Sequence, residues 1–149
     1  MSNLELIKKL REETAAGIVD VKNALEEAGN DPTRAVKILR QKGFDKAESR
    51  EGREVKAGLV DSYIHATGRI GALVVVACET DFVSRLDEFK ELAHSVAMQV
   101  AAMNPETVDE LLEQPFIKDS TKTVKDLVTE VIAKTRENIK ILEFKRFQI

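Results

Sequence analysis

The sequence predicts an α+β protein, with a small helical head followed by a core in which helices pack on three antiparallel strands. Apolar residues recur at helical spacing through residues 1–43 and again beyond residue 84. Between these segments lie two stretches rich in β-branched residues, 59–65 and 70–78, and residues 138–147 alternate as a strand does. Together these elements predict an α+β architecture.

Residues 1–43 are expected to form a bundle of three short helices. Ser2 or Asn3 can cap the first helix, the small residues 14–17 break the chain, and Gly29 suits the left-handed position after the second helix. The apolar positions at helical spacing are Leu4, Ile7 and Leu10, then Ile18, Val21, Ala24, Leu25 and Ala28, then Ala35, Val36 and Leu39. Helices this short enclose only a small interior, so some apolar side chains should remain outside.

Asp31 and Pro32 mark the start of the third helix, because the acid accepts first-turn N–H groups and proline fits the first helical position. We expect this helix to stop at Gly43. Residues 44–57 are dense in charges of alternating sign, which is typical of a solvated helix or linker. The predicted organisation is therefore the head, a charged helical linker at 44–57 and an α+β core at 58–149.

The core is expected to open with a hairpin, because residues 67–69 (Thr-Gly-Arg) separate the first two strands. Residues 73–76 (Leu-Val-Val-Val) are apolar on both faces, so this strand is expected to be covered on both sides. The third strand, 138–147, should contain a bulge where its alternation slips. Helices on one face would leave the other apolar face bare, which predicts that the sheet pairs with a second subunit.

Helical spacing returns at Ser84, and a single long helix is predicted from there to the stop at residues 104–105 (Asn-Pro). We expect a short helix over 108–113, a turn at Pro115 and a last helix over 124–136. The apolar stripe of the long helix comprises Leu86, Phe89, Ala93, Val96, Val100 and Met103.

The composition argues against several classes of function. With 23 basic and 26 acidic residues mixed along the chain, the net charge of -3 offers no clustered basic face for nucleic acid or an anionic membrane. The longest apolar run, 72–78, is far shorter than the roughly 20 residues that cross a bilayer. A single cysteine and a start without signal or transit character suit the cytoplasm. We therefore expect a cytoplasmic protein without nucleic-acid or membrane partners.

Catalytic motifs are scarce. The sequence has no Gly-rich phosphate loop, nucleophile elbow or paired-histidine motif, and we interpret His65 and His94 as structural residues. Cys78 raises the alternative of a small thiol enzyme, although a cysteine that closes a buried strand is typical of an inert apolar residue. We therefore predict no catalytic residue, no metal and no cofactor.

The string CETDFV, residues 78–83, stands at the junction between the buried strand and the following helix. One interpretation is structural, with Asp81 or Ser84 capping the helix and Phe82 packing as a hydrophobic staple. The other is that Asp81 and Phe82 project from a rigid corner as an interface anchor, since an aromatic held in this way loses little entropy on docking.

Several strings together resemble the bacterial elongation factor Ts family. They are LREETAAGIVDVKNALEEAGND at 10–31, AVKILRQKGFDKA at 35–47, CETDFV at 78–83 and RENIKILEFKRF at 136–147, and they span nearly the whole chain. The resemblance implies a head similar to ubiquitin-associated (UBA) domains and an α+β dimerisation core, of which this chain has one half. It also implies a translation elongation factor, not an enzyme, that exchanges guanine nucleotide on elongation factor Tu.

The resemblance assigns a role to Thr80, Asp81, Phe82 and Val83. In the family, the matching loop wedges into elongation factor Tu beside the Mg²⁺ ion that helps to hold GDP, and the nucleotide is then released. These residues are therefore expected to bind the partner and dislocate its ion.

The resemblance also assigns Arg11, Ile18 and Val19 to contact with the GTPase domain of elongation factor Tu. Ile18 equally fits the core face of the bundle. The implied partners are elongation factor Tu, GDP-bound or free of nucleotide, and a second copy joined through the core sheet. The alternative is an adaptor whose UBA-like head binds peptides without exchange activity; it predicts that Phe82 is buried.

Overall fold

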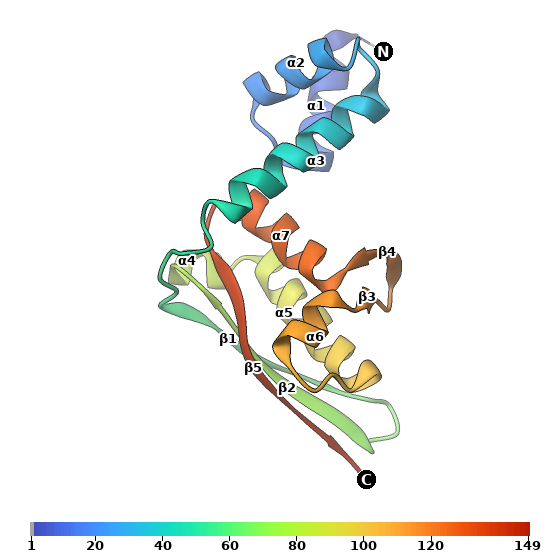
Figure 1. Ribbon diagram of the computed structural model, residues 1–149, viewed down its shortest axis with the longest axis vertical. Coiled ribbons are helices and arrows are strands. Elements are labelled where there is room, and N and C mark those ends of the chain that lie inside the picture. The colour runs from blue at the N-terminus through green and yellow to red at the C-terminus, as the bar shows by residue number, and fades with distance from the viewer. Residues whose placement is uncertain (1) are drawn as a thin grey trace.

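A computed structural model describes residues 2–149 and confirms the α+β prediction (Figure 1). The helical head lies at one end of the molecule and the sheet at the other, and α3 leads from one to the other. The helices are α1 (Asn3–Thr14), α2 (Ile18–Glu27), α3 (Pro32–Glu48), α4 (Asp81–Ser84), α5 (Asp87–Met103), α6 (Val108–Glu113) and α7 (Val124–Thr135). The strands are β1 (Ala57–Ile64), β2 (Ile70–Cys78), β3 (Pro115–Phe116), β4 (Asp119–Thr123) and β5 (Ile139–Gln148). Among residues 2–149, no helix is long and apolar enough to span a membrane.

Capping side chains begin α1 and α3, two of the three head helices, where the sequence predicts. Ser2 Oγ accepts a hydrogen bond from Glu5 N at 3.2 Å, and the Glu5 carboxylate accepts one from Ser2 N at 2.8 Å. Asp31 accepts from Thr33 N at 2.9 Å in the same way at the start of α3. These bonds satisfy first-turn donors that a helix cannot satisfy by itself.

The head interior is the small apolar cluster that helical spacing predicts, with two exceptions. Leu4 is exposed and Ile18 is 48% exposed, so these expected interior positions face solvent. A bundle of this size cannot enclose every apolar side chain on its helices. The buried residues of the head are Ile7, Leu10, Val21, Ala24, Leu25, Ala28, Ala35 and Leu39.

The expected stop of the third helix at Gly43 is wrong, because α3 continues to Glu48. A Cβ built on Gly43 would lie 3.3 Å from the Cβ of Ala133 in α7. Glycine at this position therefore allows two helices to approach closely and does not end one. Ala47, beyond the expected stop, is buried in the hydrophobic core of the sheet domain. One continuous helix thus contributes to both hydrophobic clusters.

The three long strands form one antiparallel sheet in the order β1-β2-β5. β1 and β2 are joined by the predicted hairpin, in which Gly68 has a φ of 72°. The register between β2 and β5 shifts by one residue: Val75 pairs with Glu143, whereas Val76 pairs with Ile141. Leu142 is therefore the extra residue of the predicted bulge.

Helices α5, α6 and α7 lie on one side of this sheet (Figure 1). The expectation of one long helix from Ser84 is wrong in one respect, because α4 ends at Ser84 and α5 begins at Asp87, with Leu86 between them as N-cap. Asn104 ends α5 in a left-handed conformation, with a φ of 48°, as the sequence predicts. Fully buried residues of α5 include Phe89, Ala93, Val96 and Val100.

The opposite face of the sheet is not covered by α5, α6 or α7 (Figure 1). Apolar side chains of β1 and β2 share this face with Lys140, Glu143 and Lys145 of β5. Leu73 on the central strand is 47% exposed, so the cover expected on both sides is not supplied by this part of the chain. We call this surface the open sheet face. Its exposed large apolar residues are Val60, Ile64, Leu73 and Phe147.

A small second sheet of β3 and β4 stands where a simple turn at Pro115 was expected. The buried side chain of Gln99 in α5 holds this hairpin: Nε2 donates to Pro115 O at 3.1 Å, and Oε1 accepts from Ile117 N at 3.0 Å. Residues 119–123, Asp-Ser-Thr-Lys-Thr, have no apolar alternation. No local pattern therefore predicted this strand.

Candidate functional site

The junction of residues 79–83 connects the end of β2 to the short helix α4. Thr80 is the N-cap: its Oγ1 accepts a hydrogen bond from Val83 N at 3.4 Å. The expectation that Asp81 or Ser84 caps the helix is therefore wrong. Ser84 Oγ instead donates to the carbonyl of Asp81 at 2.9 Å.

The exposure of the junction side chains separates the two interpretations of Phe82. The Phe82 ring is 74% exposed, so it does not pack as a staple, and Asp81 beside it is also exposed. Val83 points the other way and is buried in the core cluster. The junction therefore presents an acid and an aromatic ring to solvent, while the Val83 side chain packs into the core and anchors the turn.

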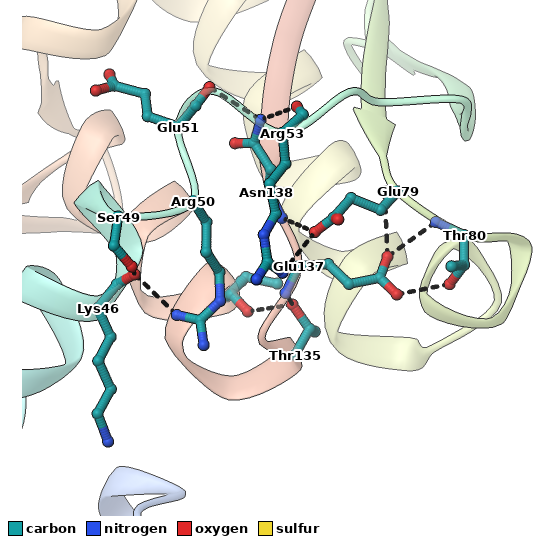
Figure 2. Close-up of polar contacts among 11 residues, drawn as sticks. Lys46, Ser49, Arg50, Glu51, Arg53, Glu79, Thr80, Thr135, Glu137 and Asn138 are labelled. Atoms are coloured by element: carbon teal, nitrogen blue, oxygen red, sulfur yellow. Dashed lines mark hydrogen bonds and ion pairs between the residues drawn. The ribbon is translucent and has the colours of Figure 1, made fainter.

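A carboxylate from a distant part of the chain holds the junction (Figure 2). Glu137 Oε1 accepts hydrogen bonds from Glu79 N at 3.1 Å and Thr80 N at 2.9 Å, and Oε2 accepts from Thr80 Oγ1 at 2.7 Å. Hydrogen bonds to an ionised acceptor are about twice as strong as those between neutral groups. Glu137 thus ties the loop that follows α7 to the residues that precede Phe82.

A second set of bonds runs in the opposite direction (Figure 2). Glu79 Oε2 accepts from Asn138 N at 2.6 Å and lies 3.7 Å from Arg53 Nη1. The buried Asn138 side chain donates from Nδ2 to the carbonyls of Glu51 and Arg53 at 3.2 and 2.7 Å. Three segments far apart in the sequence therefore meet beside the junction.

Sequence reasoning did not single out Glu137 and Asn138 as supports of the junction. They lie 57 to 59 positions from their partners in the junction, and their signal in the sequence is only that polar residues stand between a helix and an apolar strand. Helical and strand periodicities describe neighbours along one element, so they do not pair residues at this separation.

Cys78 is unsuited to nucleophilic chemistry. Its thiol is buried and donates to the carbonyl of Thr80 at 3.2 Å. Burial, and then the negative charge of Glu137, raise the pKa of this thiol from 9.0 to about 11. Cys78 also pairs with Ala57 at the start of β1, whereas His65 follows the other end of that strand. The thiol-enzyme alternative therefore has neither a thiolate nor a histidine base.

The raised pKa predicts that Cys78 resists alkylation in the folded protein. At about pH 8, iodoacetamide should modify the folded chain roughly a hundredfold more slowly than the urea-unfolded chain, because the thiolate fraction falls tenfold per pKa unit. The unfolded thiol also loses its proton first, so the free energy of unfolding should be unaffected by this group below pH 9 and should fall as the pH rises towards 11. Equal alkylation rates for the two states would contradict this prediction.

The head residues predicted to bind the partner lie on its surface. Ile18 and Val19 occupy the first turn of α2 and are 48% and 69% exposed, so the core alternative for Ile18 is wrong. Arg11 Nε donates to the carbonyl of Ala16 at 3.4 Å, across the turn in which Ala15 is left-handed with a φ of 54°. Figure 1 shows these head helices at one end of α3 and α4 near the other. The structure thus presents two separate surfaces.

Neither surface is built as a metal site. Within residues 2–149, no group of three or more His, Cys, Asp or Glu side chains is placed to hold a metal ion. The junction consists of an exposed ring, an exposed acid and a rigid support. This arrangement suits contact with another macromolecule.

Comparisons with known proteins match the chain along almost its whole length. The family profile described as Elongation factor TS matches residues 5–110 and 79–149. Proteins named Elongation factor Ts from Thermotoga petrophila, Carboxydothermus hydrogenoformans and Fervidobacterium nodosum are 44%, 42% and 39% identical to it. The alignments cover 99%, 100% and 97% of this chain, and 96%, 89% and 96% of the relatives.

The relatives are longer than this chain. The alignment with the Thermotoga petrophila protein extends over 190 positions, against 149 residues here, so at least 41 positions have no counterpart in this chain. The identity nevertheless extends over the head, the junction and the core together. This chain belongs to the elongation factor Ts family of bacterial translation elongation factors.

Proposed function

We propose that this chain is a guanine-nucleotide exchange factor that binds GDP-bound and nucleotide-free elongation factor Tu and promotes the release of GDP. The observation that carries the proposal is the exposed Phe82 ring on a corner held by Thr80 and Glu137. A rigid, solvent-exposed aromatic is a typical anchor of a protein interface. The adaptor alternative predicts a buried Phe82, and the exposure of the ring speaks against it.

The mechanism follows from how such nucleotides are held. A GTPase binds GDP through backbone groups of its phosphate loop and through a Mg²⁺ ion that contacts phosphate oxygens. Phe82 inserted beside that site would displace side chains that support the ion, and the Asp81 carboxylate would enter its surroundings. Weakened ligation of the ion lowers the affinity for GDP, and bound GDP must weaken the binding of the factor by the same free energy.

Phe82 by itself does not supply enough free energy. A shift of about ten-thousandfold in nucleotide affinity needs about 5.5 kcal/mol of differential contact energy. Burial of one large apolar side chain contributes roughly 1.5–3 kcal/mol. We therefore assign the remainder to other contacts, including a second surface on the head formed by Arg11, Ile18 and Val19.

We further propose that two copies pair through the open sheet face, which removes its exposed apolar side chains from water. The chain itself would hold no cofactor and no metal, because the ion and the nucleotide belong to elongation factor Tu. The mixed charge of the surface, with a net charge of -3, supports a cytoplasmic protein whose partners are proteins and not nucleic acid or membranes.

The experiment that tests the proposed function follows the release of fluorescent GDP from elongation factor Tu. We expect this chain to accelerate the release, and we expect excess Mg²⁺ to reduce the acceleration, because the ion then rebinds before the nucleotide leaves. Binding to elongation factor Tu without acceleration would favour the adaptor alternative and overturn the proposal. Acceleration that is independent of Mg²⁺ would overturn the mechanism while leaving the exchange activity.

A further inference from the structure

The bonds of Glu137 are concentrated on the residues immediately before Phe82. One carboxylate accepts hydrogen bonds from both backbone N–H groups of Glu79 and Thr80 and from the Thr80 hydroxyl (Figure 2). The three distances lie between 2.7 and 3.1 Å. A carboxylate has about four lone-pair directions, so three donors from one dipeptide use most of its capacity.

The hydroxyl of Thr80 connects this carboxylate to α4. A hydroxyl has one proton, and Thr80 donates it to Glu137 Oε2, which leaves its oxygen lone pairs free to accept from Val83 N. Glu137 therefore orients the cap that begins α4. Asp81 and Phe82 are the first two residues of that helix, so their direction depends on the cap.

The backbone next to Glu137 is held as well. Arg136 ends α7 in a left-handed conformation with a φ of 61°, which turns the chain towards the junction. Asn138 N donates to the Glu79 carboxylate at 2.6 Å, so each of the two loops donates backbone N–H groups to an acid of the other. The carboxylate of Glu137 thus approaches the junction from a fixed position.

We infer that Glu137 is a positioning residue for nucleotide exchange: it holds the loop of residues 79–82 so that Phe82 projects in one direction before the partner arrives. This inference rests on the proposed function, and Glu137 acts through Phe82 without touching the partner. Without the carboxylate, the loop keeps its aromatic ring but must lose conformational freedom when it docks. The loss should appear in the exchange rate more than in the stability of the fold.

Three substitutions of Glu137 separate the effect of its side-chain length from the effect of its negative charge. Glu137→Ala removes all three hydrogen bonds, and Glu137→Asp keeps the charge but is shorter by one methylene, so both should lower the maximal rate of GDP release about tenfold. Glu137→Gln keeps one carbonyl oxygen for the two N–H groups, and its NH₂ can donate to Thr80 Oγ1, so the rate should stay within about threefold of the unsubstituted protein.

The matched control is Glu130→Ala on α7. Glu130 Oε1 pairs with Lys122 Nζ at 2.9 Å, and the hydrogen bonds that hold the junction do not involve it. The substitution removes the same charge from the helix that leads into the Glu137 loop, and the exchange rate should be unchanged. An equal loss in the Glu130 and Glu137 variants would attribute the effect to charge or to general destabilisation and overturn the inference.

A double-mutant cycle with Phe82→Ala tests whether Glu137 acts through the ring. In the Phe82→Ala background, Glu137→Ala should change the maximal rate less than about twofold, because coupled residues are not additive. The concentration of factor that gives half the maximal rate should change less than the maximal rate itself, because the head contacts remain. Additive effects, or an unchanged rate for Glu137→Ala in the original background, would overturn the inference.

Amide hydrogen exchange gives a readout that is independent of activity. Glu137→Ala and Glu137→Asp should accelerate exchange at Thr80 N and Val83 N, with Glu137→Gln between them and the original protein, while amides in α5 keep their protection. If the unsubstituted chain does not accelerate GDP release from elongation factor Tu, the proposed function fails. The exchange rates of these amides still show whether Glu137 holds the loop. Unchanged protection at Thr80 in the alanine variant would overturn the positioning role.

Discussion

Replacing Phe82 with alanine should lower the maximal rate of GDP release from elongation factor Tu about thirtyfold or more. This corresponds to the roughly 2 kcal/mol or more that is lost when an interface hot spot is truncated. The ring is 74% exposed in the chain by itself, so its removal leaves the packing of the core untouched. The circular dichroism spectrum and the unfolding temperature should therefore match those of the original protein.

The control for this prediction is Ile117→Ala, which truncates another exposed apolar side chain, on the β3–β4 hairpin. That variant should keep the original rate. Phe82→Leu should fall between alanine and phenylalanine, because it restores part of the apolar volume without the flat ring. A Phe82→Ala protein with full exchange activity would remove the junction from the mechanism, and the exposed head residues would then be the remaining candidates.

Replacing Leu73 with lysine should dissociate the proposed dimer. Leu73 lies on the central strand of the open sheet face, and the register places Lys145 directly beside it on β5. In a symmetric pair the substitution occurs twice, and each buried, unpaired ammonium group is strongly unfavourable. We expect the dissociation constant to rise about a thousandfold or more. The monomer should tolerate the change, because a long lysine side chain can extend from an exposed strand into water.

Analytical ultracentrifugation at micromolar concentration checks this prediction. The original protein should sediment as twice 16.6 kDa, and the Leu73→Lys variant as a species of 16.6 kDa. Ser120→Lys, on the exposed hairpin strand β4, adds the same charge elsewhere and should remain dimeric. A monomeric original protein would overturn the dimer. A dimeric Leu73→Lys variant would move the interface away from the open sheet face.

Local signals in the sequence located most elements of the fold. Asp31 and Pro32 began a helix, Gly29 followed the end of one, and residues 67–69 formed a hairpin turn, because each satisfies or redirects the backbone within a few residues. The bulge in β5 was visible as a slip in alternation. Such features depend on neighbours along the chain and are therefore readable without the fold.

The elements that were predicted wrongly depend on contacts between distant segments. Gly43 resembles a helix stop, yet it lies where α3 packs against Ala133. The β3–β4 hairpin has no strand pattern in its sequence and is held by the side chain of Gln99 in α5. The break at Leu86 separates two helices whose apolar spacing looks continuous. Tertiary contacts overrode local preference in each case.

At the candidate site, too, some features follow from the local sequence and others from contacts between distant segments. The sequence by itself determined that an acid and an aromatic ring stand between a buried strand and a helix, because that order is a property of six consecutive residues, 78–83. Only the tertiary structure decided that Phe82 faces solvent and Val83 faces the core. It also decided that the Glu137 carboxylate, 57 positions away from Thr80, orients the Thr80 cap that precedes them. The physical reason is that exposure and long-range hydrogen bonds exist only once distant segments have packed together.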